Sequence, residues 1–327
     1  MRWPSRSEIG RRRTSALLVA LVLTLGLVPA TAVAFALQAT VLDTSAAPRW
    51  SFAARMPHRR SYAASAKIGN DIYVAAGMVG NTGRPLDLFE RFDPRKNAWT
   101  SLPGLPKAFS AAAGTALAGR MYVVGGNSPE TDGRQVFVYD VKTRRWSTRA
   151  PLPAPRTNLA VVAHQGKIYA IGGLDPVHPT STVFVYDPAA NNWSQVAPLP
   201  EELHALAAVS FRGEIWALGG RLRPGAISRR IWIYNPQSDS WRAGPPMPEP
   251  METHGAVVVG DRIHVVLESI YLTYDARTRR WIRGPSLRVP RHALAAFNTR
   301  GRLYAIGGCV VPQLEDSPIV ESISTRR

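Results

Sequence analysis

Short apolar segments separated by Gly, Pro, Asn and Asp follow one another along most of the chain. The segments are rich in β-branched and aromatic residues, a pattern that predicts β-strands joined by tight turns. Beyond about residue 40, no long segment has the 3.6-residue period of an amphipathic helix. The pattern therefore predicts an all-β domain with almost no helix.

These segments recur in a fixed order. A strand that opens with Trp and leads into a Pro-containing turn occurs six times, at Trp50, Trp99, Trp146, Trp193, Trp241 and Trp281. After each Trp strand come an apolar segment, a tight polar turn, a second apolar segment that ends in Gly-Gly in four copies, and a third strand that ends in an aromatic residue followed by Asp or Asn in most copies. A spacing of 40 to 49 residues indicates one four-stranded unit, copied and stacked.

The Gly-Gly, Tyr-Asp and Trp markers at these offsets resemble the kelch repeat, and the resemblance covers about residues 49–327. It implies a six-bladed β-propeller, a ring of four-stranded sheets that leaves only short edges exposed. In such a ring we expect Trp and Tyr side chains to fill the wedge between neighbouring sheets. The Gly pairs permit backbone conformations and close approaches that a Cβ would block.

The two ends of the repeat region predict how the ring closes. The last unit stops at a third strand, residues 319–325, whereas the strand at residues 50–54 has no first three strands before it. The simplest solution pairs these two segments, so that both ends of the chain complete the sixth blade. The fifth unit replaces Gly-Gly with Leu267-Glu268 and runs almost directly into its third strand. This shortening either opens the rim on one side or is a plain loop deletion.

The N-terminal part of the chain has a different composition. An Arg-rich start is followed by an uncharged, Ala-, Leu- and Val-rich stretch over residues 14–37, which indicates an export signal. The stretch is also long enough to span a bilayer. Residues 1–37 are thus a signal peptide or a signal-anchor, with residues 15–37 as the candidate membrane tether and 38–48 as a linker. Both alternatives predict an extracytoplasmic propeller, either secreted or periplasmic, or anchored to the membrane.

Charge and cysteine content narrow the choice of partners. The net charge is +17, and 35 of the 40 basic residues are Arg, which a codon-biased genome explains without an anionic partner. We expect no nucleic acid partner, because an exported protein meets little of it and no basic stripe interleaved with aromatic residues is present. Basic residues do cluster in turns such as residues 142–145 and 277–280, on the face that would look toward a membrane if the signal stayed uncleaved. Cys309 is the only cysteine, so no intrachain disulfide exists.

Candidate binding residues lie where each innermost strand begins, at the mouth of the central channel. They are Arg60, Arg156, Asn158, His204, Glu252, His254, Arg291 and His292. Three interpretations stay open: the side chains bond backbone groups from blade to blade, they bind an anionic or sugar-like ligand, or the three histidines hold a metal ion. We expect no metal and no cofactor.

The usual catalytic motifs of hydrolases and nucleotide-binding enzymes are missing from the sequence. We therefore expect a binding protein that recognises a protein or a glycan through the loops that connect the blades. The alternative follows from a weaker resemblance to bacterial sialic acid mutarotases, which are exported six-bladed kelch proteins. It implies a sugar mutarotase or epimerase that acts on sialic-acid-like substrates at the channel mouth, with Glu252 as the first acid–base candidate. The fold alone does not choose between these functions.

Overall fold

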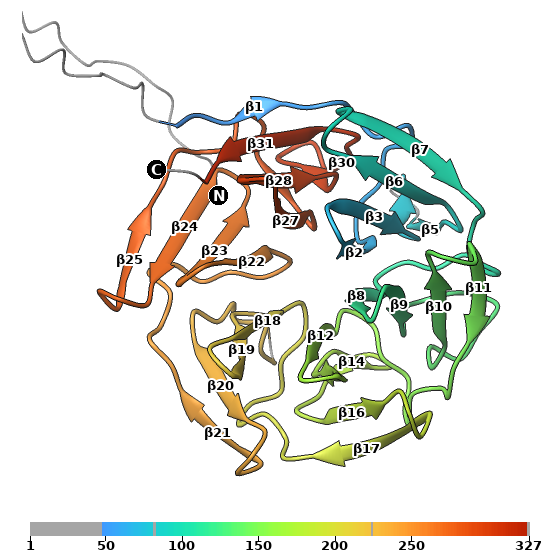
Figure 1. The fold of residues 1–327 in the computed structure, drawn as a ribbon. Helices are drawn as coiled ribbons and strands as arrows, with labels where there is room; N and C mark the ends of the chain where they lie inside the picture. Colours follow the sequence, from blue (N-terminus) through green and yellow to red (C-terminus); the bar gives the residue numbers. More distant parts are fainter. Residues whose placement is uncertain (1–47, 81–82, 224, 326–327) are drawn as a thin grey trace, which may run out of the picture. The chain divides into compact units, whose positions relative to one another are not determined.

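The computed structural model of this protein describes residues 48–80, 83–223 and 225–325. These residues form an all-β fold without a helix, in which four-stranded antiparallel sheets stand around a common axis (Figure 1). The all-β architecture that the sequence predicts is confirmed. The predicted signal peptide or anchor, residues 1–37, lies outside the described residues, as does nearly all of the linker. Within the described ranges, no helix is long and apolar enough to cross a membrane.

The described residues hold six four-stranded sheets, which we number as blades I to VI in the chain order of their innermost strands. Blade I consists of β2 (Ala64–Ile68), β3 (Asp71–Ala75), β6 (Phe89–Asp93) and β7 (Ala98–Leu102), and blade II of β8 (Ala113–Leu117), β9 (Arg120–Val124), β10 (Val136–Asp140) and β11 (Arg145–Thr148). Blade III consists of β12 (Ala160–His164), β13 (Lys167–Ile171), β16 (Val183–Asp187) and β17 (Asn192–Val196), and blade IV of β18 (Ala207–Phe211), β19 (Glu214–Leu218), β20 (Ile231–Asn235) and β21 (Ser240–Ala243). Blade V consists of β22 (Gly255–Val259), β23 (Arg262–Leu267), β24 (Ile270–Asp275) and β25 (Arg280–Arg283), and blade VI of β27 (Ala295–Thr299), β28 (Arg302–Ile306), β31 (Val320–Ser324) and β1 (Ser51–Phe52).

Both ends of the described chain complete blade VI. Ser51 lies opposite Ser322 in the ladder between β1 and β31, and the amide of Ala53 donates a hydrogen bond of 2.9 Å to the carbonyl of Val320. This is the pairing that the sequence predicts for residues 50–54 and 319–325. It covers the outer edge of β31, which would otherwise be left without a partner strand.

The two faces of the ring carry different connections. The turn face carries the turns between first and second strands and between third and fourth strands of each blade. The mouth face carries the connections between blades and the loops between second and third strands, some of which contain short extra strands: β4 (Met78–Val79), β5 (Arg84–Pro85), β14 (Leu174–Asp175), β15 (His178–Pro179), β26 (Arg291–His292), β29 (Cys309–Val310) and β30 (Glu315–Asp316). The chain reaches β1 from the turn face, because β1 runs antiparallel to β31, which ends there beside Arg302.

The repeated tryptophans fasten each blade to the one before it. Five of the six indole N–H groups donate to a backbone carbonyl four residues after the preceding repeat Trp, at 2.8 to 2.9 Å: Trp50 to Pro285, Trp99 to Ala54, Trp146 to Pro103, Trp193 to Ala150 and Trp241 to Ala197. Within the described residues, the Trp281 indole N–H has no hydrogen-bond partner. The tryptophans therefore add a directional bond to the wedge filling that the sequence predicts.

The Gly-Gly pairs supply a second link between blades. In blade II the amide of Gly126 donates 2.8 Å to the carbonyl of Arg156, and a Cβ on Gly125 would lie only 2.4 Å from that same oxygen. Blade V, which lacks the pair, keeps the link through the amide of Glu268, which donates 2.7 Å to the carbonyl of Arg291. The shortened blade therefore still engages its neighbour.

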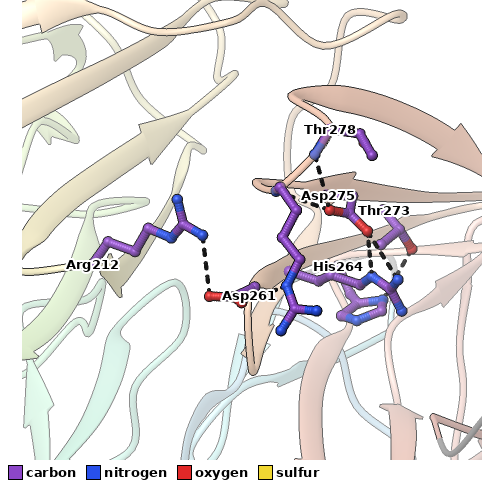
Figure 2. Close-up of polar contacts among 8 residues, drawn as sticks. Arg212, Asp261, His264, Thr273, Asp275 and Thr278 are labelled. Carbon is purple, nitrogen blue, oxygen red and sulfur yellow. Dashed lines mark hydrogen bonds and ion pairs between the residues drawn. The ribbon is translucent and has the colours of Figure 1, made fainter.

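Blade V also carries two buried histidines. Nδ1 of His264 lies 2.8 Å from the Tyr271 hydroxyl and 3.0 Å from the Thr273 hydroxyl. Figure 2 shows Thr273 on the strand next to His264. Burial, reinforced by the charge of Arg262, lowers the pKa of His264 to about 4. Burial alone lowers the pKa of His254 to about 4. Both imidazoles are therefore neutral at pH 7.

Replacing Trp241 by Phe should destabilise the protein more than replacing Trp281 by Phe. Both indoles pack on a tyrosine of their own blade, with ring centroids 5.0 Å from Tyr234 and 5.3 Å from Tyr274, but only Trp241 makes the bond to the preceding blade. The difference should be about 1–2 kcal/mol, measured from the denaturant midpoints of the two variants. Equal destabilisation would show that the indole bond contributes nothing to stability.

Acidification from about pH 6.5 to about pH 4 should destabilise the fold. The two imidazoles titrate near 6.5 in the unfolded chain and near 4 in the folded protein. The unfolded chain therefore binds more protons in this window, and the free energy of unfolding falls as the pH falls, by up to about 3 kcal/mol for each histidine. Thermal melting at a series of pH values measures the effect.

The matched variant for this measurement is His254→Leu. The other five blades hold Ala or Leu at the corresponding position, at Ala63, Ala112, Leu159, Leu206 and Leu294. The variant should lose part of the acid sensitivity while keeping its fold at pH 7. An unchanged dependence of the melting temperature on pH would rule out His254 as a source of the acid lability.

Candidate functional site

The candidate site lies on the mouth face, where the chain turns into each innermost strand. Three consecutive residues, which we call the mouth triplet, occupy this place in every blade: Arg60-Ser61-Tyr62, Phe109-Ser110-Ala111, Arg156-Thr157-Asn158, Leu203-His204-Ala205, Met251-Glu252-Thr253 and Arg291-His292-Ala293. The first member is buried in all six blades. The second member lies 11 residues after the repeat Trp in each of them.

The third members of the triplets form a closed circuit of backbone hydrogen bonds around the channel mouth. Each amide donates to the carbonyl of the third member in the preceding blade, at 2.7 to 3.4 Å: Ala111 to Tyr62, Asn158 to Ala111, Ala205 to Asn158, Thr253 to Ala205, Ala293 to Thr253 and Tyr62 to Ala293. All six residues have a φ between 50° and 56°. This left-handed backbone costs a non-glycine residue about 1 kcal/mol, so its recurrence in every blade shows that the ring imposes it.

The three arginines of the candidate set are buried first members, and they bond within their own blades. The guanidinium of Arg60 donates to the carbonyl of Val74 at 3.1 Å and to the carboxylate of Glu90 at 2.7 Å. Arg291 donates to the carbonyls of Gly307 and Ile319 at 2.8 and 2.6 Å. The sequence left open a structural role from blade to blade for these side chains. Arg60 and Arg291 hold strands of one blade together instead, and it is the backbone carbonyls of the triplets that link the blades.

Arg156 is held in the same way at the start of blade III. Its guanidinium is 2.7 Å from the carboxylate of Asp175 and lies over the ring of Phe184, 5.2 Å from the ring centroid. The side chain is 2% exposed, so little of it reaches the surface, although Arg156 is among the residues that line a depression of about 700 Å³ on this face. Asn158, the third member of the same triplet, lines the mouth.

The second members of blades IV, V and VI line one cavity of about 420 Å³. His204, Glu252 and His292 face it together with Tyr62, Arg221 and Glu268. Nε of Arg221 lies 2.6 Å from Oε2 of Glu252, and its Nη2 pairs with Oε1, so the two side chains form a bidentate ion pair. The cavity therefore holds a neutralised pair beside two imidazoles and a carboxylate.

Burial decides the protonation of the imidazoles at the mouth. It lowers the pKa of His204, against a raising effect of Glu252 and with a further lowering effect of Arg221. It also lowers the pKa of His292, although Glu268 and Glu252 act in the opposite direction. Both side chains are therefore neutral at pH 7, and each offers one hydrogen-bond donor and one acceptor to a ligand.

His254 does not join the other two histidines. It lies two residues beyond Glu252, at an otherwise apolar position, and both ring nitrogens are buried without a partner among the described residues. The three-histidine cluster considered from the sequence is therefore not formed. In the part of the chain that the structure describes, no group of three or more His, Cys, Asp or Glu side chains is placed to hold a metal ion.

Sequence reasoning did not select Tyr62, Arg221 or Glu268 as site residues. Arg221 directly follows the Gly-Gly pair of blade IV, and its backbone pairs with that of His204 in an isolated bridge. The equivalent position in each blade lies 28 residues after the repeat Trp. Counting from Trp193 could therefore have found Arg221 from the sequence. Tyr62 is the one aromatic third member of the triplets, and its ring meets the His292 ring edge-on at a centroid distance of 6.3 Å.

A second depression adjoins the mouth cavity. It has a volume of about 700 Å³ and lies over blades I to III, between the loop at residues 126–133 and the hairpin of β14 and β15. Tyr62 and Asn158 line both depressions, so the two adjoin. At the tip of the hairpin, Val177 is 70% exposed.

Comparison with known proteins places this geometry in a family. A model of the KLHDC2/KLHL20/DRC7 Kelch-repeats domain matches residues 62–266. The chain is 35% identical over 103 residues to the F-box/kelch-repeat protein At1g26930 of Arabidopsis thaliana, covering 29% of this chain and 24% of that protein. It is also 35% identical over 83 residues to Kelch-like protein 21 of Danio rerio, covering 25% of this chain and 13% of that protein. The chain thus spans a quarter or less of these two relatives.

A solved structure described as "Structure of YjhT" has a similar fold. The TM-score is 0.70 at 16% sequence identity, and the match covers 82% of this chain and 95% of that one. At this identity the likeness concerns the fold alone. The family match extends over more than half of the chain, and it shows that this protein belongs to the kelch-repeat family.

Proposed function

We propose that this protein is a six-bladed propeller, latched by its two ends, that binds a protein or a glycan outside the cytoplasm through its mouth face. Membership of the kelch-repeat family supports a protein-binding or related role. The observation that carries the proposal is the pair of adjoining depressions on the mouth face, the cavity of about 420 Å³ and the groove of about 700 Å³.

The chemistry of the rim suits a macromolecular ligand. Three large apolar side chains project from loops around the depression: Val177 of blade III is 70% exposed, Ile227 of blade IV 41% and Leu314 of blade VI 58%. Apolar anchors around a polar centre are typical of protein recognition surfaces. Only two residues separate β23 from β24 in blade V, so the rim is lowest between Ile227 and Leu314.

The polar floor of the mouth cavity suits hydroxyl groups as well. Two neutral imidazoles, the ion pair of Arg221 and Glu252, and the ring of Tyr62 meet there. Such a set can hydrogen-bond sugar hydroxyls and stack on a sugar ring. The proposed ligand is therefore either a glycan or a protein. The Arg-rich start and the uncharged stretch over residues 14–37 support export.

The convergence of His204, His292 and Glu252 on one cavity favours a second candidate, the sugar mutarotase or epimerase. Opening and closing a sugar ring requires one group that accepts a proton from the anomeric hydroxyl and one that gives a proton to the ring oxygen. One neutral imidazole can accept the first proton, and the protonated form of the other histidine would give the second. Both carboxylate oxygens of Glu252, the first acid–base candidate from the sequence, are engaged by Arg221 in a bidentate ion pair.

Substitutions on the mouth face should abolish binding without unfolding the protein. We expect Val177→Asp and Arg221→Ala to weaken binding at least about tenfold, because each removes an anchor worth roughly 1–2 kcal/mol or more. The measurement combines a glycan array with affinity capture from the producing cells, followed by titration of the ligand that is found. The control is Ile282→Asp, which alters an apolar side chain that is 47% exposed on β25 at the periphery. Binding that is unchanged in the mouth variants and lost in the control would contradict the proposal.

The enzymatic candidate makes a separate prediction for sialic acid. If it holds, the protein accelerates the interconversion of the two anomers, measured by magnetisation exchange in NMR, and the double variant His204→Asn/His292→Asn lowers the rate at least about a hundredfold. The same Ile282→Asp variant serves as the control with unchanged rate. An interconversion rate equal to that in protein-free buffer would eliminate this candidate and leave the binding proposal standing.

A further inference from the structure

We propose that the turn face docks on an anionic lipid surface. The turns between the third and fourth strands carry exposed cations on three blades. Blade I contributes Arg95 and Lys96, and the largest groups are in blades II and V: Lys142, Arg144, Arg145, Arg277, Arg279 and Arg280. This proposal concerns the opposite face from the ligand site and does not depend on the function proposed for that site.

Three acidic residues beside these turns, Asp140, Asp275 and Asp261, are already engaged. Asp140 closes the turn of blade II, since its Oδ1 accepts bonds from the amides of Lys142 and Thr143 and its Oδ2 accepts from Arg120 at 2.9 Å. Asp275 closes the turn of blade V in the same manner, with Arg262 as its cation. These carboxylates are part of the repeat and are not free to neutralise the exposed cations.

Asp261 is engaged between two blades. Its Oδ1 accepts a bond of 3.2 Å from Arg212 of blade IV, and its Oδ2 accepts one of 2.9 Å from Arg277 of blade V. Figure 2 shows Arg212 reaching Asp261 across the gap between the blades, with Asp275 bonded to the backbone at Thr278. These acidic groups are therefore already bonded within the turns and between the blades.

The remaining cations have no such partner. In the part of the chain that the structure describes, the side chains of Lys96, Lys142, Arg144, Arg145, Arg279 and Arg280 make no hydrogen bond or ion pair. The mouth face differs, because several of its arginines are paired with carboxylates, as in Arg156 with Asp175, Arg221 with Glu252 and Arg230 with Glu201. On the turn face, by contrast, these exposed cations are grouped in three turns and are unpaired within the described residues.

The spacing of these cations indicates a broad partner. Blades II and V stand on opposite sides of the ring, at β10 and β11 and at β24 and β25 (Figure 1). A small anion requires cations that converge on one point, whereas these point outward from separate turns of a disc. A flat layer of phosphate headgroups meets all of them at once.

The path of the chain favours lipid over other polyanions. The described chain begins at the turn face, just before β1. Residues 38–49 separate this point from the uncharged stretch over residues 14–37, and a linker of this length reaches at most about 40 Å. A bilayer that held or adjoined that stretch would lie within reach of the basic turns.

The test uses the full chain with a fluorophore on a single added cysteine, because Cys309 is the only native cysteine and is buried. The label is placed either on Thr278→Cys of the turn face or on Val177→Cys of the mouth face. Vesicles of phosphatidylcholine, with or without about 30 mol % phosphatidylglycerol, carry a quencher on their headgroups. We expect quenching of the turn-face label in anionic vesicles only, no quenching of the mouth-face label, and loss of the signal at about 0.5 M salt.

Matched charge variants complete the experiment. The triple variant Lys142→Gln/Arg144→Gln/Arg145→Gln, in the blade opposite the label, should raise the concentration of anionic lipid needed for half-quenching by about a hundredfold. The control neutralises three exposed arginines of the mouth face, Arg59, Arg84 and Arg223, and should change this lipid concentration little. Equal quenching in neutral vesicles, or equal loss in the control, overturns the proposal. A turn-face label that responds to soluble heparin but not to anionic vesicles assigns the face to an acidic polysaccharide and overturns it as well.

Discussion

The circuit of six backbone hydrogen bonds at the channel mouth is the constraint on which the site depends. It runs through the third members of the mouth triplets and closes only when the amide of Tyr62 reaches the carbonyl of Ala293, across the junction of the first and last blades. That junction exists because β1 pairs with β31 and places Trp50 against blade V. The pairing of the chain ends therefore also determines the shape of the mouth.

A backbone fixed in this way leaves the second member of each triplet free to vary. Three blades hold Ser or Thr at this position, whereas His204, Glu252 and His292 occupy it in three consecutive blades. The ionisable second members are thus gathered on one half of the mouth, and the groove over the other half is lined mostly by loop residues. Chemistry is added to a repeating scaffold by changing residues that the scaffold does not need.

The fold was predictable because the markers that reveal it are set by contacts inside and between neighbouring blades. A repeat Trp must reach a carbonyl in the preceding blade, and a Gly-Gly pair must pass close to the next blade, so both recur at constant offsets. The positions of His204, Glu252 and His292 followed from the same spacing. His254 was wrongly grouped with them, because its place directly after the triplet is visible only when the offset from each Trp is counted.

What the sequence could not decide was the direction of the triplet arginines. Arg60 and Arg291 point into their blades because Glu90 and Glu321, each 30 residues further along, lie buried on the third strands beside them. Arg221 looks like an ordinary loop residue, yet the bridge to His204 brings it to the mouth.

The two faces differ because the turns on one face repeat from blade to blade, whereas the loops on the other face vary in length. On the turn face, aspartates recur because each closes a turn at the end of a third strand, which fixes the acidic groups and leaves the intervening basic residues exposed. On the mouth face, the loops between second and third strands range from two residues in blade V to much longer segments in the other blades. Repetition therefore fixes the acidic groups of the turn face beside exposed basic turns on three blades, and variation produces a ligand site. Because the chain joins β1 on the turn face, a propeller docked by that face presents its mouth away from the lipid, where a ligand can reach it.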